Sequence, residues 1–247
     1  IVPNYVLENP HPTVIVGKKC DVFPIEFVMR AYLTGSTNTS IWTHYKNGSR
    51  NYCGFELKDG MKKKQKLENV ILTPTTKSDV HDEPLTLSDI VSKGYMNKED
   101  LDICEKYAYE LFNFSQNEVA KKGLILVDTK YEFGKDKDGN ILLIDEIQTP
   151  DSSRYWIENS YEDRMKNNEE PENIDKEFVR LWYKKNCNPY EDENIPEPPI
   201  DLINELTKKY ISLYETITGN IFKYEDNEID DDTTKLYTLR NTYNCLL

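Results

Sequence analysis

A chain of 247 residues, with 38% hydrophobic and 30% charged side chains, can bury the core of one large or two small domains. Its net charge of −13 argues against a nucleic-acid or anionic-membrane partner, because those surfaces bind basic patches. No apolar run approaches the ~18 residues of a membrane span, and the sequence opens on no secretory signal. Five widely spaced cysteines without a Cys-x-x-Cys pair indicate free thiols in a reducing compartment. We therefore expect a cytoplasmic protein.

Two strands and one helix are expected in the first part of the chain. Val14–Val16 is a short β-branched run, and the polar residues 18–21 after it form a connector. Apolar and polar residues then alternate over Ile25–Leu33, which predicts a strand with one buried face. Ser36 is a good N-cap for a helix that runs to about Tyr45.

Longer helices and a hairpin are expected in the rest of the chain. Asn97 or Asp100 can cap a long helix with apolar residues at helical spacing. A β-hairpin follows, with its turn at Asp138-Gly139. Two amphipathic helices are expected over residues 173–186 and 202–217. The predicted fold class is α+β, with mostly antiparallel strands and helices gathered on one side.

The hairpin carries charge where a core would need apolar residues. Asp128, Lys130 and Glu132 alternate at period two, so they point to one side of the first strand. A two-residue turn at Asp138-Gly139 would set Glu132 directly opposite Asp145. Facing carboxylates cost up to ~1 kcal/mol, and a divalent cation would compensate for this repulsion. The alternative is an ordinary solvated strand face.

Two weaker clusters also carry polar chemistry. Arg30 precedes Gly35 and Ser36 at an expected helix start, which is a plausible phosphate cradle or merely a helix cap with a nearby arginine. The segment from Thr73 onward gathers hydroxyl groups, Lys77 and Asp82. By itself this segment is more typical of a capped, solvated turn than of a site.

Together these segments resemble the SAICAR synthetase (phosphoribosylaminoimidazole-succinocarboxamide synthase) family, in its longer, yeast-like form. The resemblance covers roughly residues 10–222, and its motifs occur in the order that the family has. They are Pro24-Ile-Glu-Phe-Val-Met-Arg30 with Leu33-Thr-Gly-Ser36, Leu72-Thr-Pro-Thr-Thr-Lys77 with His81-Asp82, Gly123-Leu-Ile-Leu-Val-Asp-Thr-Lys-Tyr-Glu-Phe-Gly134, and Asp145-Glu146 with Thr149-Pro-Asp-Ser-Ser-Arg-Tyr-Trp156.

The resemblance implies a two-lobed architecture similar to that of kinases and ATP-grasp enzymes. The implied parts are the end of an N-terminal ATP-binding lobe (1–17), an inter-lobe hinge (18–23), a large substrate- and ATP-binding lobe (24–223) and a loosely ordered acidic tail (224–247). The family's small lobe carries a glycine-rich phosphate loop and a lysine. Nothing in the sequence corresponds to that loop, so we expect this lobe in the same gene or in a separate segment.

The resemblance also implies an activity. The family joins L-aspartate to CAIR, a carboxylated aminoimidazole ribonucleotide, through an acyl phosphate made with ATP and Mg²⁺, and releases SAICAR, ADP and phosphate in purine biosynthesis. The expected partners are these substrates, with no nucleic acid and no membrane. One alternative is a non-catalytic or split subunit that binds nucleotide. Another is a related ATP-dependent ligase or kinase with a different acceptor.

The acceptor contacts follow from the resemblance residue by residue. Arg30, Ser36 and Arg154 would bind the 5′-phosphate of CAIR. Asp128 and Lys130 would contact its imidazole part. Lys130 would also stabilise the reacting carboxylate.

The remaining contacts would serve the other substrates. Glu132 and Asp145 would hold Mg²⁺ against the ATP phosphates. Lys77 and Asp82 would lie near the aspartate or the transferred phosphate. Glu26 would either form a hydrogen bond near ATP or be a buried structural partner, and the sequence favours neither alternative. Backbone groups of the connector would meet the adenine, which involves Lys18, Lys19, Cys20 and Asp21.

Overall fold

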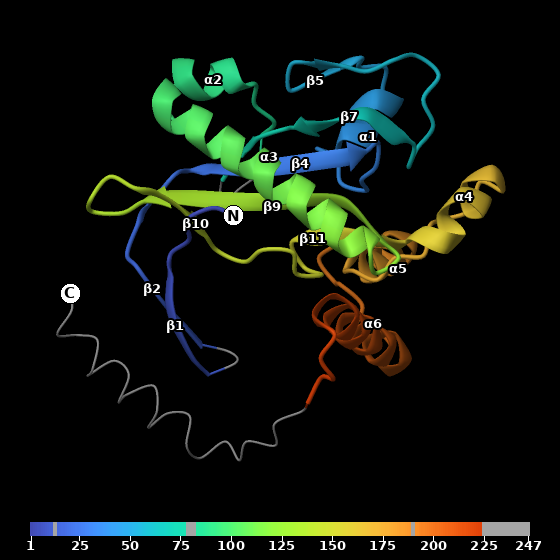
Figure 1. Cartoon of the computed structure of the whole chain (residues 1–247). Helices are drawn as coiled ribbons and strands as arrows, with labels where there is room; N and C mark the ends of the chain where they lie inside the picture. Colours follow the sequence, from blue (N-terminus) through green and yellow to red (C-terminus); the bar gives the residue numbers. More distant parts are fainter. Residues whose placement is uncertain (12–13, 78–82, 189–190, 224–247) are drawn as a thin grey trace.

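The computed structural model describes residues 1–11, 14–77, 83–188 and 191–223 (Figure 1). In this part of the chain, antiparallel strands form one main sheet, and helices of very different lengths pack around it. The expected acidic tail, together with His81 and Asp82, lies outside the described residues. No helix within the described ranges is both long and apolar enough to cross a bilayer.

Strand β9 (Leu124–Lys135) is the centre of the main sheet. Its first half lies between β4 (Ile25–Tyr32) and β11 (Ser153–Ile157), and its second half pairs with β10 (Ile141–Ile144) and β3 (Asp21–Val22). Strands β7 (Lys66–Leu72) and β8 (Thr75–Thr76) extend the sheet beyond β4. Every one of these pairings is antiparallel, as the sequence predicts.

The core explains why β4 was recognisable from the sequence. Ile25, Phe27 and Met29 are fully buried on one face of β4. The long helix α3 (Lys98–Ala120) lies along this side of the sheet (Figure 1) and buries its apolar residues against β9 and β4. Its N-cap is Asn97, whose side chain accepts a hydrogen bond from the backbone N–H of Asp100. The predicted helix is therefore confirmed, with Asn97 as its cap.

The helix expected after Ser36 begins later than predicted. Helix α1 (Ile41–Lys46) starts at Ser40, whose side-chain oxygen accepts from the N–H of Thr43 at 3.3 Å. Ser36 lies in the preceding loop, so its assignment as N-cap was wrong. Both serines precede a plausible helix, and the later start buries Ile41 in a small core that includes Leu33 and Tyr52. The short hairpin of β5 (Asn51–Tyr52) and β6 (Phe55–Glu56) lies close by.

The register of the β9–β10 hairpin differs by one residue from the prediction. Glu132 pairs with Ile144, not with Asp145. The connection is the five-residue loop 136–140 rather than a two-residue turn, because the side chain of Asp136 accepts backbone N–H groups of Asp138 and Asn140 at 3.0 and 2.9 Å. The cross-strand carboxylate pair therefore does not exist in the predicted form.

The remaining elements lie at the two ends of the sheet. Strands β1 (Val6–His11) and β2 (Val14–Gly17) form a separate hairpin, which includes the predicted run at residues 14–16. Helix α5 (Glu177–Asn186) falls within the predicted region 173–186, and helix α6 (Ile200–Thr218) contains the predicted region 202–217 and extends it at both ends. The sequence did not predict β11, α2 (Leu87–Ser92) or α4 (Glu158–Lys166).

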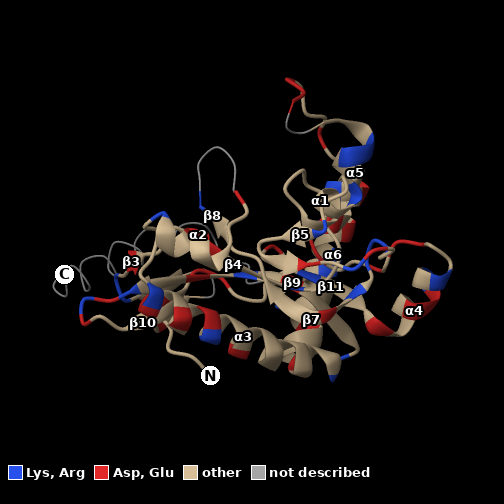
Figure 2. Cartoon of the chain, turned by 90° about the horizontal axis from the view of Figure 1, so that it is seen from above, with Lys and Arg blue, Asp and Glu red and all other residues tan. Residues whose placement is uncertain are grey.

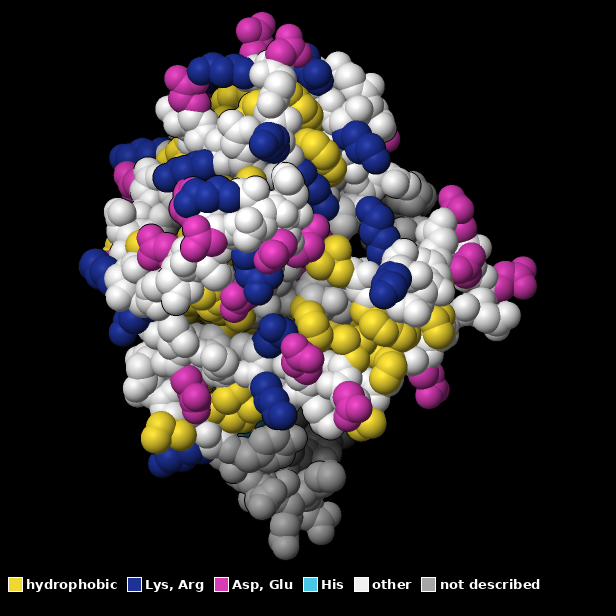
Figure 3. Space-filling view, turned by 90° about the vertical axis from the view of Figure 1, so that its right-hand side faces the viewer, with side chains coloured by type: hydrophobic (Ala, Val, Ile, Leu, Met, Phe, Trp, Pro, Cys, Tyr) yellow, Lys and Arg dark blue, Asp and Glu magenta, His cyan; other side chains and the backbone are white. Residues whose placement is uncertain are grey.

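Helices α4, α5 and α6 gather near β11 (Figure 1). Hydrophobic side chains are exposed among mixed charges on the molecular face shown in Figure 3, and α6 itself exposes Ile200 and Ile203. The charged residues of β9, β11 and α5 lie near one another when the chain is viewed from above (Figure 2). This end of the sheet therefore combines strand and helix residues from distant parts of the sequence.

Candidate functional site

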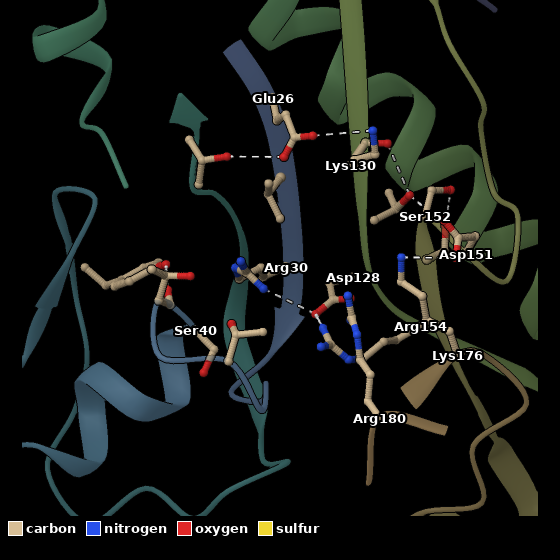
Figure 4. Close-up of a pocket in the computed structure, with 17 residues that line it drawn as sticks. Glu26, Arg30, Ser40, Asp128, Lys130, Asp151, Ser152, Arg154, Lys176 and Arg180 are labelled. Carbon is tan, nitrogen blue, oxygen red and sulfur yellow. Dashed lines mark hydrogen bonds and ion pairs between the residues drawn. The ribbon is translucent and has the colours of Figure 1, made fainter. Parts of the chain in front are cut away.

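A polar cavity of about 220 Å³ opens over the first half of β9 (Figure 4). Its walls come from β4, β9, β11, the loop before α1 and the first turns of α5. The lining includes Arg30, Asp128, Lys130 and Arg154 of the predicted site, but not Ser36. Two of the three alternating charged residues of β9, Asp128 and Lys130, therefore face a shared cavity rather than open solvent.

Three neighbouring strands place an acid between two arginines. Arg30 of β4 and Arg154 of β11 are both cross-strand partners of Asp128 on β9. The Nη1 atoms of Arg30 and Arg154 lie 3.3 and 2.7 Å from Oδ2 of Asp128, whose residue is only 4% exposed. Thr73 accepts a further hydrogen bond from Nε of Arg30 at 2.9 Å. The sheet register itself thus brings together two of the three residues predicted to bind phosphate.

A second acid holds Arg154 from the other side. Oε2 of Glu177, at the start of α5, accepts from Nε and Nη2 of Arg154 at 3.3 and 3.1 Å. Burial by itself lowers the pKa of Arg154, but the carboxylates of Asp128 and Glu177 raise it above its ordinary value. Burial raises the pKa of Glu177, whereas Arg154 and the side chain of Ser36 lower it, with a net decrease. Ser36 therefore reaches the arginine cluster through Glu177.

Further along β9, lysines and carboxylates form a second cluster. Nζ of Lys130 lies 2.6 Å from Oε1 of Glu132, 3.0 Å from Oδ2 of Asp145 and 3.4 Å from Oε1 of Glu26. The other oxygen of Glu132 accepts from Nζ of Lys77 at 2.5 Å. Glu132 is 2% exposed, so these ammonium groups neutralise a buried charge. Glu132 and Asp145 therefore share one cationic partner, the ammonium group of Lys130, although they are not cross-strand partners.

The pKa shifts in this cluster follow from the same contacts. Burial lowers the pKa of Lys130, but its hydrogen bonds to Glu132 and Asp145 raise it above the ordinary value. Burial raises the pKa of Asp145, whereas Lys130 lowers it, and the net shift is downward. Both groups are consequently charged at neutral pH, with carboxylates in excess over ammonium groups.

The donor set suits a magnesium ion of the phosphate-bridging type. The ammonium of Lys130 stands where a cation would contact Glu132 and Asp145 together. Mg²⁺ commonly uses one or two carboxylates and completes its octahedron with water and phosphate oxygens. Among the described residues no group of three or more His, Cys, Asp or Glu side chains is placed to hold a metal, so a metal cage made of protein alone is not present there.

The predicted connector is tied to the far end of β9. Lys18 forms an ion pair with Asp136 at 3.6 Å, and the thiol of Cys20 contacts the carbonyl oxygen of Lys18 at 3.5 Å. Burial and then Asp136 raise the pKa of the Cys20 thiol. Asp21 already belongs to β3. A Cβ at Gly134 would lie 2.9 Å from Cβ of Cys20, so this close approach requires glycine.

The contribution of α5 to the cavity was not predictable from the sequence. Lys176 and Arg180 line it, and Lys176 is paired with Asp151 at 3.2 Å. The sequence indicated only an amphipathic helix here. Charged residues on such a helix are usually solvated, so no local pattern distinguishes these two from the others.

Comparisons with known proteins agree with this architecture. The sequence profile of the SAICAR synthetase family matches residues 1–197. The chloroplastic phosphoribosylaminoimidazole-succinocarboxamide synthase of Arabidopsis thaliana is 58% identical over 220 residues, which are 89% of this chain and 54% of that protein. The enzyme of the same name from Legionella pneumophila (strain Lens) is 52% identical over 227 residues, 92% of this chain and 73% of that protein. The chain thus spans about half of the first relative and three quarters of the second.

Solved structures give the same result. SAICAR synthase of Saccharomyces cerevisiae, complexed with SAICAR, superposes with a TM-score of 0.71 at 27% identity over 90% of this chain and 77% of that chain. A type-2 SAICAR synthetase in complex with ADP has a TM-score of 0.65 at 23% identity over 90% and 75% of the two chains, and this likeness concerns the fold alone. The chain belongs to the SAICAR synthetase family.

Proposed function

We propose that this chain contributes to the ATP-dependent ligation of L-aspartate to CAIR, with SAICAR, ADP and phosphate as products. The observation that carries the proposal is the cavity flanked by Arg30 and Arg154 on one side and by Lys130 on the other. CAIR carries a phosphate and a carboxylate. The guanidinium groups of the cavity can bind the phosphate, and the ammonium group can bind the carboxylate. Many molecules carry both a phosphate and a carboxylate, and membership of the family is the reason for proposing CAIR among them.

In the proposed complex the arginine cluster binds the 5′-phosphate of CAIR. Arg30 and Arg154 hold their guanidinium groups in position through Asp128, so little ordering is needed when the anion arrives. Asp128 also faces the cavity, where its carboxylate can accept a hydrogen bond from the amino group of the imidazole. Ser36 belongs to the rim of this site through its contact with Glu177.

Lys130 has the central role in the chemistry. A carboxylate is a poor electrophile until a phosphoryl group turns one of its oxygens into a leaving group, after which the aspartate amine attacks the carbonyl carbon. Enzymes assist such transfers chiefly by positioning and charge neutralisation. The ammonium of Lys130, at the edge of the cavity, can neutralise the reacting carboxylate and hold it in place.

Glu132 and Asp145 are the residues that would hold Mg²⁺, which when bound would neutralise charge on the phosphate oxygens of ATP. Lys77 contacts Glu132 and directly follows strand β8, whose Thr75 lines the cavity. From this position it can serve the aspartate or the transferred phosphate. Asp82, proposed for the same task, is outside the described residues. Glu26 pairs with Lys130, and the connector with Lys18, Lys19, Cys20 and Asp21 remains the proposed contact for adenine.

An assay of ADP release tests the proposal. With CAIR, ATP, Mg²⁺ and the expected ATP-binding lobe present, release is expected to depend on L-aspartate. Calorimetric binding of CAIR without ADP release would favour the alternative of a non-catalytic or split subunit. If neither CAIR binding nor ADP release is observed, the proposed activity is wrong. The cytoplasmic location and the preceding ATP-binding lobe stay predictions, and the Arabidopsis relative is chloroplastic by name.

A further inference from the structure

Helix α6 exposes a row of apolar side chains along one side. Ile200, Ile203 and Tyr214 are 67%, 42% and 43% exposed. At 3.6 residues per turn these positions share one face with Thr207, whose hydroxyl donates to the carbonyl oxygen of Ile203 at 3.0 Å. None of these four residues, here called the α6 stripe, lines the acceptor cavity. Single exposed hydrophobic residues are ordinary, but a row on one helix face indicates a contact surface.

The helix has few buried side chains of its own. Within α6, all of which the structure describes, Leu213 is the single buried residue, at 1% exposure. Helix α5 is its main neighbour, and Nζ of Lys209 lies 4.9 Å from the ring centre of Phe178 there. Figure 1 shows α6 below α4 and α5, on their outer side. Because helices in proteins are stabilised mainly by packing an apolar face, a helix of 19 residues with one buried side chain calls for a further partner.

The chain that leaves α6 turns back onto the stripe. Gly219, with a φ of +73°, ends the helix in the left-handed conformation. The N–H of Phe222 then donates to Oε1 of Glu215 at 2.9 Å. The Phe222 ring lies edge-on to the ring of Tyr214, with centroids 5.7 Å apart. The last described residues are therefore directed along the stripe rather than away from the helix.

The sequence that follows contains an apolar pattern of the matching kind. Six of the eight residues 225–232 are acidic, whereas residues 235–247 contain no acid. In this second segment, apolar residues recur at the spacing of one face of an amphipathic helix, namely at Leu236, Leu239, Tyr243 and Leu246. The segment therefore has a face that can pack against the stripe.

The length of the connection permits this contact. The described chain ends at Lys223, so residues 224–234 connect it to the apolar segment. Fully extended, this connection reaches about 35 to 40 Å. Helix α6 is about 28 Å long, so every part of the stripe is within reach.

We propose that residues 235–247, which lie outside the described residues, form an amphipathic helix that docks on the α6 stripe. The acidic residues 225–232 stay in water and connect the two helices. A second copy of the chain could cover the same stripe, but it must be recruited from solution. The tethered segment is present at an effective concentration in the millimolar range, which favours it as the occupant.

Hydrogen exchange of the full chain, measured by mass spectrometry of its peptides, tests this inference. Leu239→Asp places a carboxylate in the proposed contact, so exchange should become about tenfold faster or more in residues 235–247 and in α6. Asn241→Asp adds the same charge on the opposite side of the proposed helix and should change both rates by less than about twofold.

A matching pair of variants tests the other side of the contact. Ile203→Asp should accelerate exchange in residues 235–247 as Leu239→Asp does. Ser212→Asp is its control, because Ser212 is exposed on another face of α6. If Ile203→Asp does not fold, Leu239→Asp decides the question, since it alters no contact of the described residues.

Four results would overturn the inference. Residues 235–247 could exchange as fast as an unstructured peptide in the unaltered chain. Leu239→Asp could accelerate exchange in this segment but leave α6 unchanged, which would place the segment elsewhere. Equal effects of Leu239→Asp and Asn241→Asp would show that added charge, not a lost contact, is responsible. Protection of α6 that rises with protein concentration, with a dimer seen by light scattering, would show that a second copy covers the stripe.

Discussion

The two charged clusters on β9 stand on one face of one strand, but they have opposite charge balance. Around Asp128 the three guanidinium groups of Arg30, Arg154 and Arg180 meet the carboxylates of Asp128 and Glu177. The sheet register places Arg30 and Arg154 on the two strands that flank β9. Around Lys130 the carboxylates of Glu26, Glu132 and Asp145 outnumber the ammonium groups. The first cluster suits an anion and the second a cation. An alternating strand can thus present sites of both signs a few residues apart.

Lys130→Met should have the largest effect, because this residue belongs to the carboxylate-rich cluster and also faces the acceptor cavity. We expect aspartate-dependent ADP release to fall about 10²- to 10³-fold, as when a positioned charge donor is removed. The pKa of Asp145, which Lys130 keeps low, should rise. NMR titration of Asp145 provides a readout that does not depend on turnover. Lys137→Met is the control, since Lys137 is exposed in the hairpin loop; an equal effect there would contradict this role of Lys130.

Arg154→Met should damage the arginine-rich cluster alone. It removes the partner that Asp128 and Glu177 share, so we expect the KM for CAIR to rise about 100-fold with little change for ATP. Steady-state kinetics with each substrate varied in turn measures the ratio. Equal changes in both KM values would mean that the two clusters do not serve separate substrates. Arg164→Met, on α4 and away from the cavity, is the matched control.

The attachment of α5 to the arginine-rich cluster should depend on pH. Burial raises the pKa of Asp175 to about 7, so the native state holds a proton that the unfolded chain has lost above pH ~4. The stability that this proton contributes is complete below pH ~4 and is lost as pH rises to about 7, by at most about 1.4 kcal/mol per pH unit.

Asp175→Asn should flatten this part of the stability profile. Urea unfolding at several pH values between 4 and 7 measures the slope for both proteins. Asp163→Asn, an exposed carboxyl on α4, should keep the original slope. An unchanged slope in Asp175→Asn would show that another group controls the attachment of α5.

The smallest expected effect concerns the support that both clusters share. Helix α3 packs beneath β9, and its first turn is capped by Asn97. Asn97→Ala should lower the free energy of unfolding by about 1 kcal/mol without changing either KM. Asn113→Ala, at an exposed position inside the same helix, should cause no loss. A change in the KM for CAIR alone would show that α3 supports the clusters unequally.

Local patterns predicted the elements that local physics determines. The alternation in β4 and the capped periodicity of α3 reflect one buried face each, so these elements were recoverable from the sequence. The strand β9 was recoverable from its alternating charges, although both of its faces are largely buried. The hairpin register could not be predicted from the sequence, because the side chain of Asp136 stabilises a longer loop than the Asp138-Gly139 signal indicates. Arg180 lines the cavity and Glu177 contacts Arg154 because Asp175 holds the start of α5 against β11. Such tertiary attachment leaves no periodic signal.

The central claim is that the anion-binding and cation-binding halves of the site follow one another along β9. Crystals soaked with Mn²⁺ and inorganic phosphate test it most directly, since the anomalous signal locates manganese, which takes the same oxygen ligands as magnesium. We predict manganese against Glu132 and Asp145, with Lys130 displaced, and phosphate between Arg30 and Arg154. Manganese elsewhere, or phosphate away from both arginines, would contradict the account.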